Sequence, residues 1–181
     1  MSHIAIMILA SFAANVGNVS FGIAHTSKGE QIPLRAIVAL SAVIAFFSAL
    51  AVQLGHWLEG RILFDNADEY AEWIAGILFG FIGIRLSLAE HHSLVRKKAL
   101  LKQEWWISAL GLFPNNLTVG LSGGFLGFHP ILFGVTLGST SGLLLWAGTL
   151  IGIRQQCNQI TWMHRLGAAI LLLLATIQFL R

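Results

Sequence analysis

Six long apolar segments recur along the 181-residue chain, and each is long enough to cross the hydrocarbon core of a lipid bilayer. A helix rises 1.5 Å per residue, so about 20 apolar residues span a core of roughly 30 Å. A water-soluble domain of this size would instead surround one core with a polar surface. The predicted transmembrane helices cover residues 4–24, 34–58, 70–89, 105–124, 131–153 and 162–180.

Charged residues are scarce and lie mainly between these segments. Asp, Glu, Lys and Arg make up 10% of the chain, whereas soluble domains carry about 25%. The stretches between the apolar segments are short and leave no room for a separate soluble domain. We therefore expect an all-α polytopic membrane protein, a single membrane domain over residues 1–181, with membrane lipid as its surrounding partner.

The sequence lacks the motifs of several functional classes. It has no glycine-rich phosphate loop, no nucleophile elbow and no zinc-protease motif, so we expect neither enzymatic activity nor a cofactor. The net charge of +3 is not arranged as a basic stripe with interleaved aromatic residues, so we expect no nucleic acid partner. The one cysteine, Cys157, cannot form an internal disulfide.

Lysine and arginine are distributed unequally between the two sides of the predicted bundle. Cytoplasmic loops of membrane proteins carry an excess of these residues. We therefore predict a multi-pass protein of the cell (inner) membrane with both termini facing away from the cytoplasm. The predicted cytoplasmic side has Lys28, Arg35, Arg96, Lys97, Lys98, Lys102, Arg154 and Arg165, and the opposite side has Arg61 and Arg181.

The two halves of the chain resemble each other. A shift of 100 residues places Asn15 on Asn115, and a shift of 93 aligns the small residues of the second and fifth spans. Repeat 1 (about 1–92) and repeat 2 (about 103–181) each have three spans, so the second must enter the membrane from the opposite side. Inverted repeats of this kind are typical of secondary transporters, whose substrate sites lie near the membrane midplane. The oligomeric state stays open, a homo-oligomer included.

Polar side chains form one face of the first and of the fourth predicted span. Ser11, Asn15 and Asn18 follow helical spacing, and Asn115 and Thr118 repeat it. An amide buried in lipid without a partner costs on the order of several kcal/mol, so these asparagines must bond to each other, to water or to a ligand. Interhelical bonding alone is the alternative for any single residue. The predicted substrate or ion path is lined by Asn15, Asn18, Asn115, Asn116, Thr118 and Ser122.

Other features of the spans have narrower interpretations. Pro114 removes a backbone donor and is expected to leave the Leu110 carbonyl available to an ion. Arg85 is the one charge well inside a span, where it is either functional or able to extend toward the basic loop. Glu90 with its two neighbouring histidines is a further candidate for a divalent cation site at the cytoplasmic mouth.

Small residues recur every four positions in the second and fifth spans. This spacing puts them on one helix face, where they allow two backbones to approach closely. We therefore predict that the two spans pack against each other along this face. The residues are Ser41, Ala45 and Ala49 in the second span, and Gly134, Gly138 and Gly142 in the fifth.

Several segments together resemble the manganese efflux pump (MntP-like) family and its YtaF-like relatives. The resemblance covers nearly the whole chain, and its order and spacing are more specific than any one segment. The segments are residues 13–22 (AANVGNVSFG), 55–60 (GHWLEG), 82–85 (IGIR) and 114–120 (PNNLTVG), followed by 127–130 (GFHP).

The resemblance implies export of a divalent metal cation such as Mn²⁺ by a secondary transporter that works by alternating access. In that family the first and fourth spans each carry an aspartate, in a Ser-x-Asp-Ala pattern, that handles the cation. The matching positions here are Asn15 and Asn115, which become the candidate metal-binding residues. Neutral amides offer carbonyl oxygens but neither balance a divalent charge nor accept a proton. Two alternatives therefore remain: a transporter of a monovalent ion or small polar solute, and a non-transporting membrane subunit.

Overall fold

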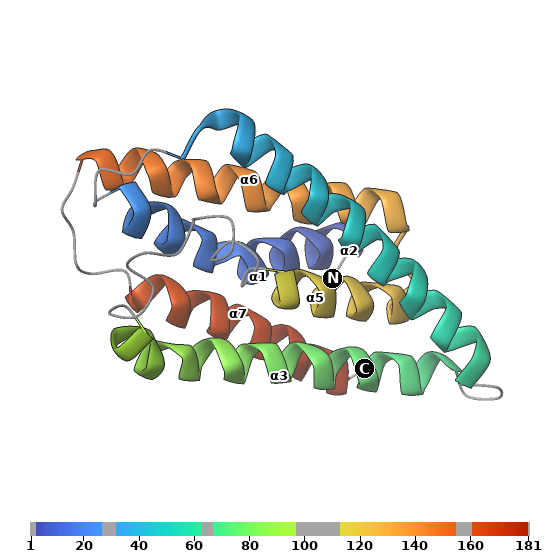
Figure 1. Cartoon of the computed structure of the whole chain (residues 1–181). Helices are drawn as coiled ribbons and strands as arrows, with labels where there is room; N and C mark the ends of the chain where they lie inside the picture. The colour runs from blue at the N-terminus through green and yellow to red at the C-terminus, as the bar shows by residue number, and fades with distance from the viewer. Residues whose placement is uncertain (1–2, 27–31, 63–66, 97–112, 155–160, 181) are drawn as a thin grey trace.

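The structure is a computed structural model that describes residues 3–26, 32–62, 67–96, 113–154 and 161–180. These residues form helices that lie roughly along one common direction, and the described part of the chain contains no strand (Figure 1). The all-helical fold expected from the sequence is confirmed. The helices are α1 (His3–Thr26), α2 (Leu34–Ile62), α3 (Ala67–Arg96), α5 (Phe113–Phe125), α6 (Pro130–Arg154) and α7 (Thr161–Phe179).

Three helices of the described chain are long and apolar enough to cross a membrane: His3–Thr26, Leu34–Arg61 and Pro130–Ile153. They match the first, second and fifth predicted spans. The apolar part of α7, Arg165–Phe179, is shorter. Only the second part of the predicted span 105–124 is seen as α5, because residues 105–112 lie outside the described chain.

Two of the three prolines of the chain, Pro33 and Pro130, stand at helix starts. Pro33 precedes α2 and its carbonyl accepts from the Ala36 amide at 2.9 Å. Pro130 opens α6, where a missing backbone donor costs nothing. Pro114 is the second residue of α5 as described, and because the preceding residues lie outside the described chain, its predicted effect on the turn before it stays a prediction. The Leu110 carbonyl lies outside the described residues.

The turn between α5 and α6 is fixed by a glycine. The Phe128 amide donates to the Gly123 carbonyl at 2.9 Å, and the Gly127 amide donates to the Gly124 carbonyl at 3.0 Å. This pattern is a Schellman motif, which needs a left-handed residue, and Gly127 has φ of +70°. The chain can therefore reverse direction within a few residues and place α6 beside the bundle.

The first three helices are interleaved with the last three. The most extensive contacts pair α1 with α6, α2 with α6, α3 with α7 and α2 with α5, whereas α2 and α3 touch only slightly. In the α2–α6 pair, an ideal Cβ at Gly138 would lie 2.6 Å from Ala45 Cβ, and one at Gly134 would lie 2.7 Å from Ala49 Cβ. The predicted packing face of small residues is confirmed.

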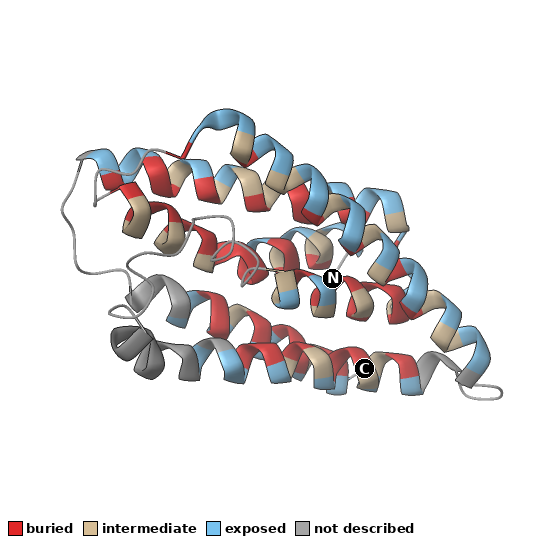
Figure 2. Cartoon of the chain, in the orientation of Figure 1, coloured by how far each residue is buried: buried red, intermediate tan, exposed pale blue. Residues whose placement is uncertain are grey.

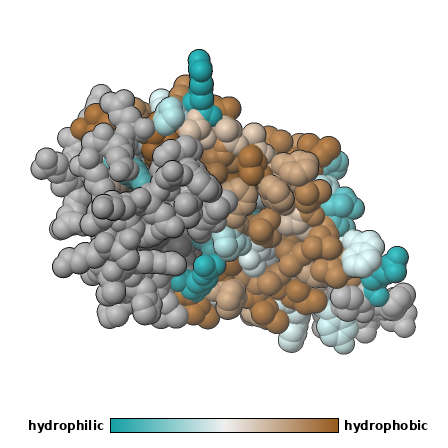
Figure 3. Space-filling model, in the orientation of Figure 1, coloured by the Kyte–Doolittle hydropathy of each residue, from teal (hydrophilic) through white to brown (hydrophobic). Residues whose placement is uncertain are grey.

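The bundle is apolar on the outside. Large hydrophobic side chains such as Phe46 (61% exposed), Phe81 (62%) and Leu143 (62%) point away from the neighbouring helices. Figure 2 shows buried residues on the inner faces of the helices, and Figure 3 shows hydrophobic side chains over much of the coloured surface. Exposed apolar surface of this extent requires an apolar environment. Together with the three long apolar helices, it identifies an integral membrane protein.

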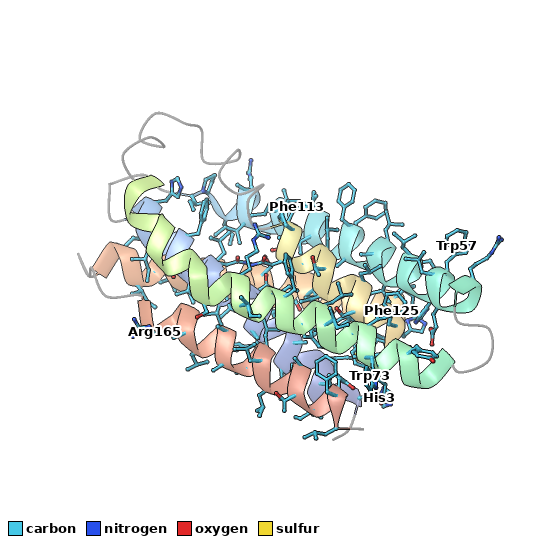
Figure 4. All side chains as sticks on the ribbon, turned by 90° about the horizontal axis from the view of Figure 1, so that it is seen from below. His3, Trp57, Trp73, Phe113, Phe125 and Arg165 are labelled. Atoms are coloured by element: carbon cyan, nitrogen blue, oxygen red, sulfur yellow. The ribbon has the colours of Figure 1, made fainter. Side chains whose placement is uncertain are left out.

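Both ends of the described chain lie at the same end of the bundle (Figure 1). The turn at Gly127 is at this end too, as are the half-exposed Trp57 and Trp73 (Figure 4). Arg165 marks the opposite end (Figure 4). Exposed tryptophans near helix ends are typical of membrane–water interfaces.

Candidate functional site

One face of α1 carries polar side chains that are sealed inside the bundle. Ser11 and Asn15 are 0% exposed and Asn18 is 1% exposed. Their spacing places them on one side of the helix, and that side faces α6. The helix therefore buries its amides and exposes apolar residues such as Ile4 and Ile8, as expected in a membrane.

The two α1 amides form one hydrogen-bonded cluster with α6. Asn18 Nδ2 donates to Asn15 Oδ1 at 2.9 Å and to Ser141 Oγ at 2.7 Å. Asn15 Nδ2 donates to the Ser11 carbonyl at 2.9 Å and to the Leu137 carbonyl at 3.3 Å. Of the partners that the sequence left open, Asn15 and Asn18 therefore use each other and α6. Their other partners belong to α6, which sequence spacing did not identify.

Glycines hold α1 and α6 close enough for these bonds. An ideal Cβ at Gly22 would lie 2.6 Å from the Leu145 carbonyl oxygen, and one at Gly148 would collide with the Val19 carbonyl oxygen. Any side chain at either position would push the helices apart, because the atom in the way is backbone. The close approach lets short side chains such as Ser141 reach the amides of α1.

The second predicted stripe, on α5, uses its hydroxyls differently. Thr118 Oγ1 donates to the Pro114 carbonyl at 2.8 Å, and Ser122 Oγ donates to the Thr118 carbonyl at 2.9 Å. Such bonds to the carbonyl four residues earlier are common for hydroxyls in helices. Asn116 (1% exposed) and Ser122 (0% exposed) are buried, so α5 also presents polar groups to the interior.

Asn115 lies beside the only intramembrane charge that the sequence singled out. Arg85 Nη1 of α3 donates to Asn115 Oδ1 at 3.4 Å, and this contact is exposed. The guanidinium is therefore oriented toward the position where the family resemblance places an aspartate. A positive charge at this distance disfavours a cation at Asn115 unless a carboxylate offsets it.

The two polar stripes have different neighbours. The α1 cluster bonds to α6, and Asn115 bonds to α3. Helices α1 and α5 make much less contact with each other than α1 makes with α6. The bonds described here therefore do not join Asn15 to Asn115, although each stripe contributes buried polar groups to the bundle.

One buried residue was not singled out as a site from the sequence. Gln178 of α7 is 0% exposed, and within the described residues neither of its amide atoms has a hydrogen-bond partner. A lone glutamine near the end of an apolar helix gives little signal, because the same pattern is usual at an interface. Only the packing of α7 against α3 shows that the side chain points inward.

Metal-binding groups are not preassembled in the described part of the chain. No three His, Cys, Asp or Glu side chains there are placed to hold one ion. The side chains of Glu90, His91 and His92 lie outside the described set, so that candidate site stays a prediction. Cys157 also lies outside it.

The comparisons with known proteins agree on one family. The family described as "Putative manganese efflux pump" matches residues 31–179. The protein named putative manganese efflux pump MntP from Bacillus licheniformis is 26% identical over 170 residues, covering 92% of this chain and 90% of the relative. Its namesake from Bacillus thuringiensis (strain Al Hakam) is 27% identical over 149 residues, covering 81% and 79%.

A third relative, from Bacillus velezensis, carries the same name and is 26% identical over 170 residues, covering 91% of this chain and 89% of the relative. No solved structure gives a significant match. The family match spans most of the chain, from just before α2 to the end of α7. The chain therefore belongs to the manganese efflux pump (MntP) family.

Proposed function

We propose that the protein is a secondary transporter that exports a divalent, manganese-like cation by alternating access. The names of its relatives support this class of substrate. The observation that carries the proposal is the buried cluster of Asn15 and Asn18 inside a bundle with an apolar exterior. Amide carbonyl oxygens are hard ligands and suit Mn²⁺, although they bind it less strongly than carboxylates.

Transport through this cluster requires α1 and α6 to separate. In the described arrangement the amide nitrogens of Asn15 and Asn18 bond to α6, and both residues are sealed. An ion would be coordinated by the amide oxygens, so these side chains must turn and water must enter. We assign the described arrangement to a closed state of the cycle, in which Asn15 and Asn18 bond to α6 instead of to an ion.

Reciprocal glycine contacts support two inverted repeats. A Cβ at Gly22 of α1 would lie 2.6 Å from the Leu145 carbonyl oxygen of α6, and one at Gly124 of α5 would collide with the Val52 carbonyl oxygen of α2. If the two halves are exchanged, α1 takes the place of α5 and α2 takes the place of α6. The α1–α6 contact then becomes the α5–α2 contact. The remaining main pairs, α2–α6 and α3–α7, join helices that the same exchange would interchange.

These contacts favour a different register from the one read in the sequence. They align Gly22 with Gly124, an offset of 102 residues, and Gly55 with Gly148, an offset of 93. The first offset differs by two from the shift that aligned Asn15 with Asn115. Two residues correspond to more than half a helical turn, so in this register the two asparagines are not equivalent.

A second candidate is a transporter of a monovalent ion or small polar solute. The lining of Asn15, Asn18 and Ser141 is neutral, and Arg85 places a positive charge beside Asn115. Both features lower the affinity for a divalent cation. They favour a species that needs less charge compensation, such as a monovalent ion or a neutral solute. The same buried bonds would also serve a non-transporting subunit as interhelical contacts.

Flux measurements on the purified chain in proteoliposomes distinguish these functions. We expect wild-type protein to release loaded Mn²⁺, and Asn15→Ala and Asn18→Ala to slow release by at least about tenfold, equivalent to 1.4 kcal/mol. Ser139→Ala is the matched control, because Ser139 is exposed on α6 and bonds only to its own helix in the described structure. Release of K⁺ or of a neutral solute without Mn²⁺ release would support the second candidate. If the wild type moves no solute and the two asparagine variants only lose thermal stability, a non-transporting subunit is supported.

A further inference from the structure

A cavity of about 330 Å³ lies where α1 begins and where α2, α5 and α7 end. Its polar lining comes from His3 of α1, Glu59 of α2, Glu72 of α3 and Gln178 of α7. The labelled residues His3 and Phe125, which both line it, lie toward the end of the bundle marked by Trp57 and Trp73 (Figure 4). The cavity is therefore at the end that holds both chain termini.

Gln178 leaves two hydrogen-bonding groups in the cavity without a protein partner in the described residues. It is 0% exposed, it lines the cavity, and neither amide atom has a hydrogen-bond partner within the described residues. A buried amide without partners costs on the order of 1–3 kcal/mol. Gly76 of α3 admits this side chain, since a Cβ there would lie 3.3 Å from Gln178 Cβ. Water or an ion in the cavity would provide the missing bonds.

The charges of the lining favour a cation as the ligand. Two carboxylates, from Glu59 and Glu72, attract a cation, and the Gln178 amide supplies a further hard oxygen. The His3 ring rests edge-on against Phe128, with ring centroids 5.7 Å apart, which holds the imidazole at the cavity wall. Two of the eight acidic residues of the chain line this cavity.

The geometry suits a hydrated cation. Liquid water takes roughly 30 Å³ per molecule, so the cavity can hold an ion with its first hydration shell. Within the described residues no three metal-binding side chains are close enough to strip that shell. Binding through water is weaker than direct coordination, and an ion must leave the exit of a transport path readily.

We propose that this cavity is the exit vestibule of the transporter, where Glu59, Glu72 and Gln178 receive a divalent cation and release it hydrated on the side of the termini. The inference rests on the proposed export function. It adds a binding site remote from the asparagine cluster and supplies the negative charge that the cluster lacks.

The test is Mn²⁺ binding to the purified full-length chain in detergent, followed by electron paramagnetic resonance. We expect the double variant Glu59→Gln/Glu72→Gln to weaken Mn²⁺ binding at least about tenfold, and Gln178→Leu to weaken it less. Glu59→Asp and Glu72→Asp keep the charge and are expected to retain binding if the fold is intact. Glu30→Gln is the matched control, because residue 30 lies between α1 and α2, at the other end of both helices.

Flux in proteoliposomes separates the two proposals. If the wild type releases Mn²⁺ and the double variant releases it more slowly, the vestibule is supported. If the wild type releases Mn²⁺ but the double variant binds and releases it equally well, the vestibule is wrong and the export function stands. If the wild type moves no Mn²⁺ at all, the export function fails and the exit role fails with it, whatever the cavity binds.

Discussion

At the scale of single residues, the surroundings of Asn15 explain why an amide suits this position. The Asn15 nitrogen faces the carbonyl oxygens of Ser11 and Leu137 and the hydroxyl of Thr140 at 3.3 Å. Two of these three groups can only accept hydrogen bonds. A donor is therefore required at this atom in the closed arrangement, and asparagine provides it.

The substitution Asn15→Asp tests this explanation. A carboxylate oxygen would face the Ser11 and Leu137 carbonyls, so we expect the free energy of unfolding to fall by about 1–3 kcal/mol in the presence of a chelator. Added Mn²⁺ is expected to restore the loss, because the ion would lie between the opposed oxygens. Thermal unfolding of detergent-purified protein with and without MnCl₂ measures both effects. Asn15→Leu is the control and should lose stability without recovery; equal behaviour of the two variants would contradict the explanation.

At the scale of the helices, close backbone contact determines which elements pair. The α2–α6 contact depends on glycines of α6 lying against small residues of α2. In membranes such contacts replace the hydrophobic driving force, since lipid tails are as apolar as leucine. Each glycine therefore contributes through the close packing that it permits.

The substitution Gly138→Ala should disrupt this pair. The new Cβ would lie 2.5 Å from the Ser41 carbonyl oxygen and 2.6 Å from Ala45 Cβ, so the helices must separate. We expect a loss of about 1–3 kcal/mol in unfolding free energy. Gly60→Ala is the matched control, because nothing lies within 4 Å of a Cβ there, and it should be neutral or slightly stabilising. Equal melting temperatures for the two variants would show that the contact does not limit stability.

Sequence reasoning succeeded where a local pattern determines the outcome. The helix positions followed from the length of the apolar runs, and the α2–α6 contact followed from small residues spaced four apart. The partner of the Asn15 face did not follow, because periodicity defines a face but not the helix that covers it. The first part of the predicted span 105–124 stays a prediction, because residues 105–112 lie outside the described chain.

At the scale of the whole molecule, the arrangement of the helix ends bears on orientation. The described chain begins and ends at one end of the bundle, and the basic segments between α1 and α2 and between α3 and α5 follow helix ends on the other (Figure 1). Because cytoplasmic loops carry an excess of basic residues, the prediction that the termini face outward follows from this arrangement. The proposed vestibule would face the same outer side.

Thiol labelling in right-side-out membrane vesicles tests this orientation. In a Cys157→Ser background, Leu180→Cys should react with a membrane-impermeant maleimide, because Leu180 is 81% exposed at the outward end. Cys157 of the unmodified chain follows α6 at the other end and should react only after the vesicles are permeabilised. The reverse pattern would place the termini in the cytoplasm.

The interleaving of the helices has a consequence for biogenesis. The surfaces that cover α1, α2 and α3 are supplied almost entirely by helices that the ribosome makes later. The buried amides of α1 find their partners on α6, more than 120 residues downstream. During synthesis the early helices must therefore wait in the insertion machinery or in lipid with their polar faces unpaired. The buried polar contacts of α1 can therefore form only after α6 has been made.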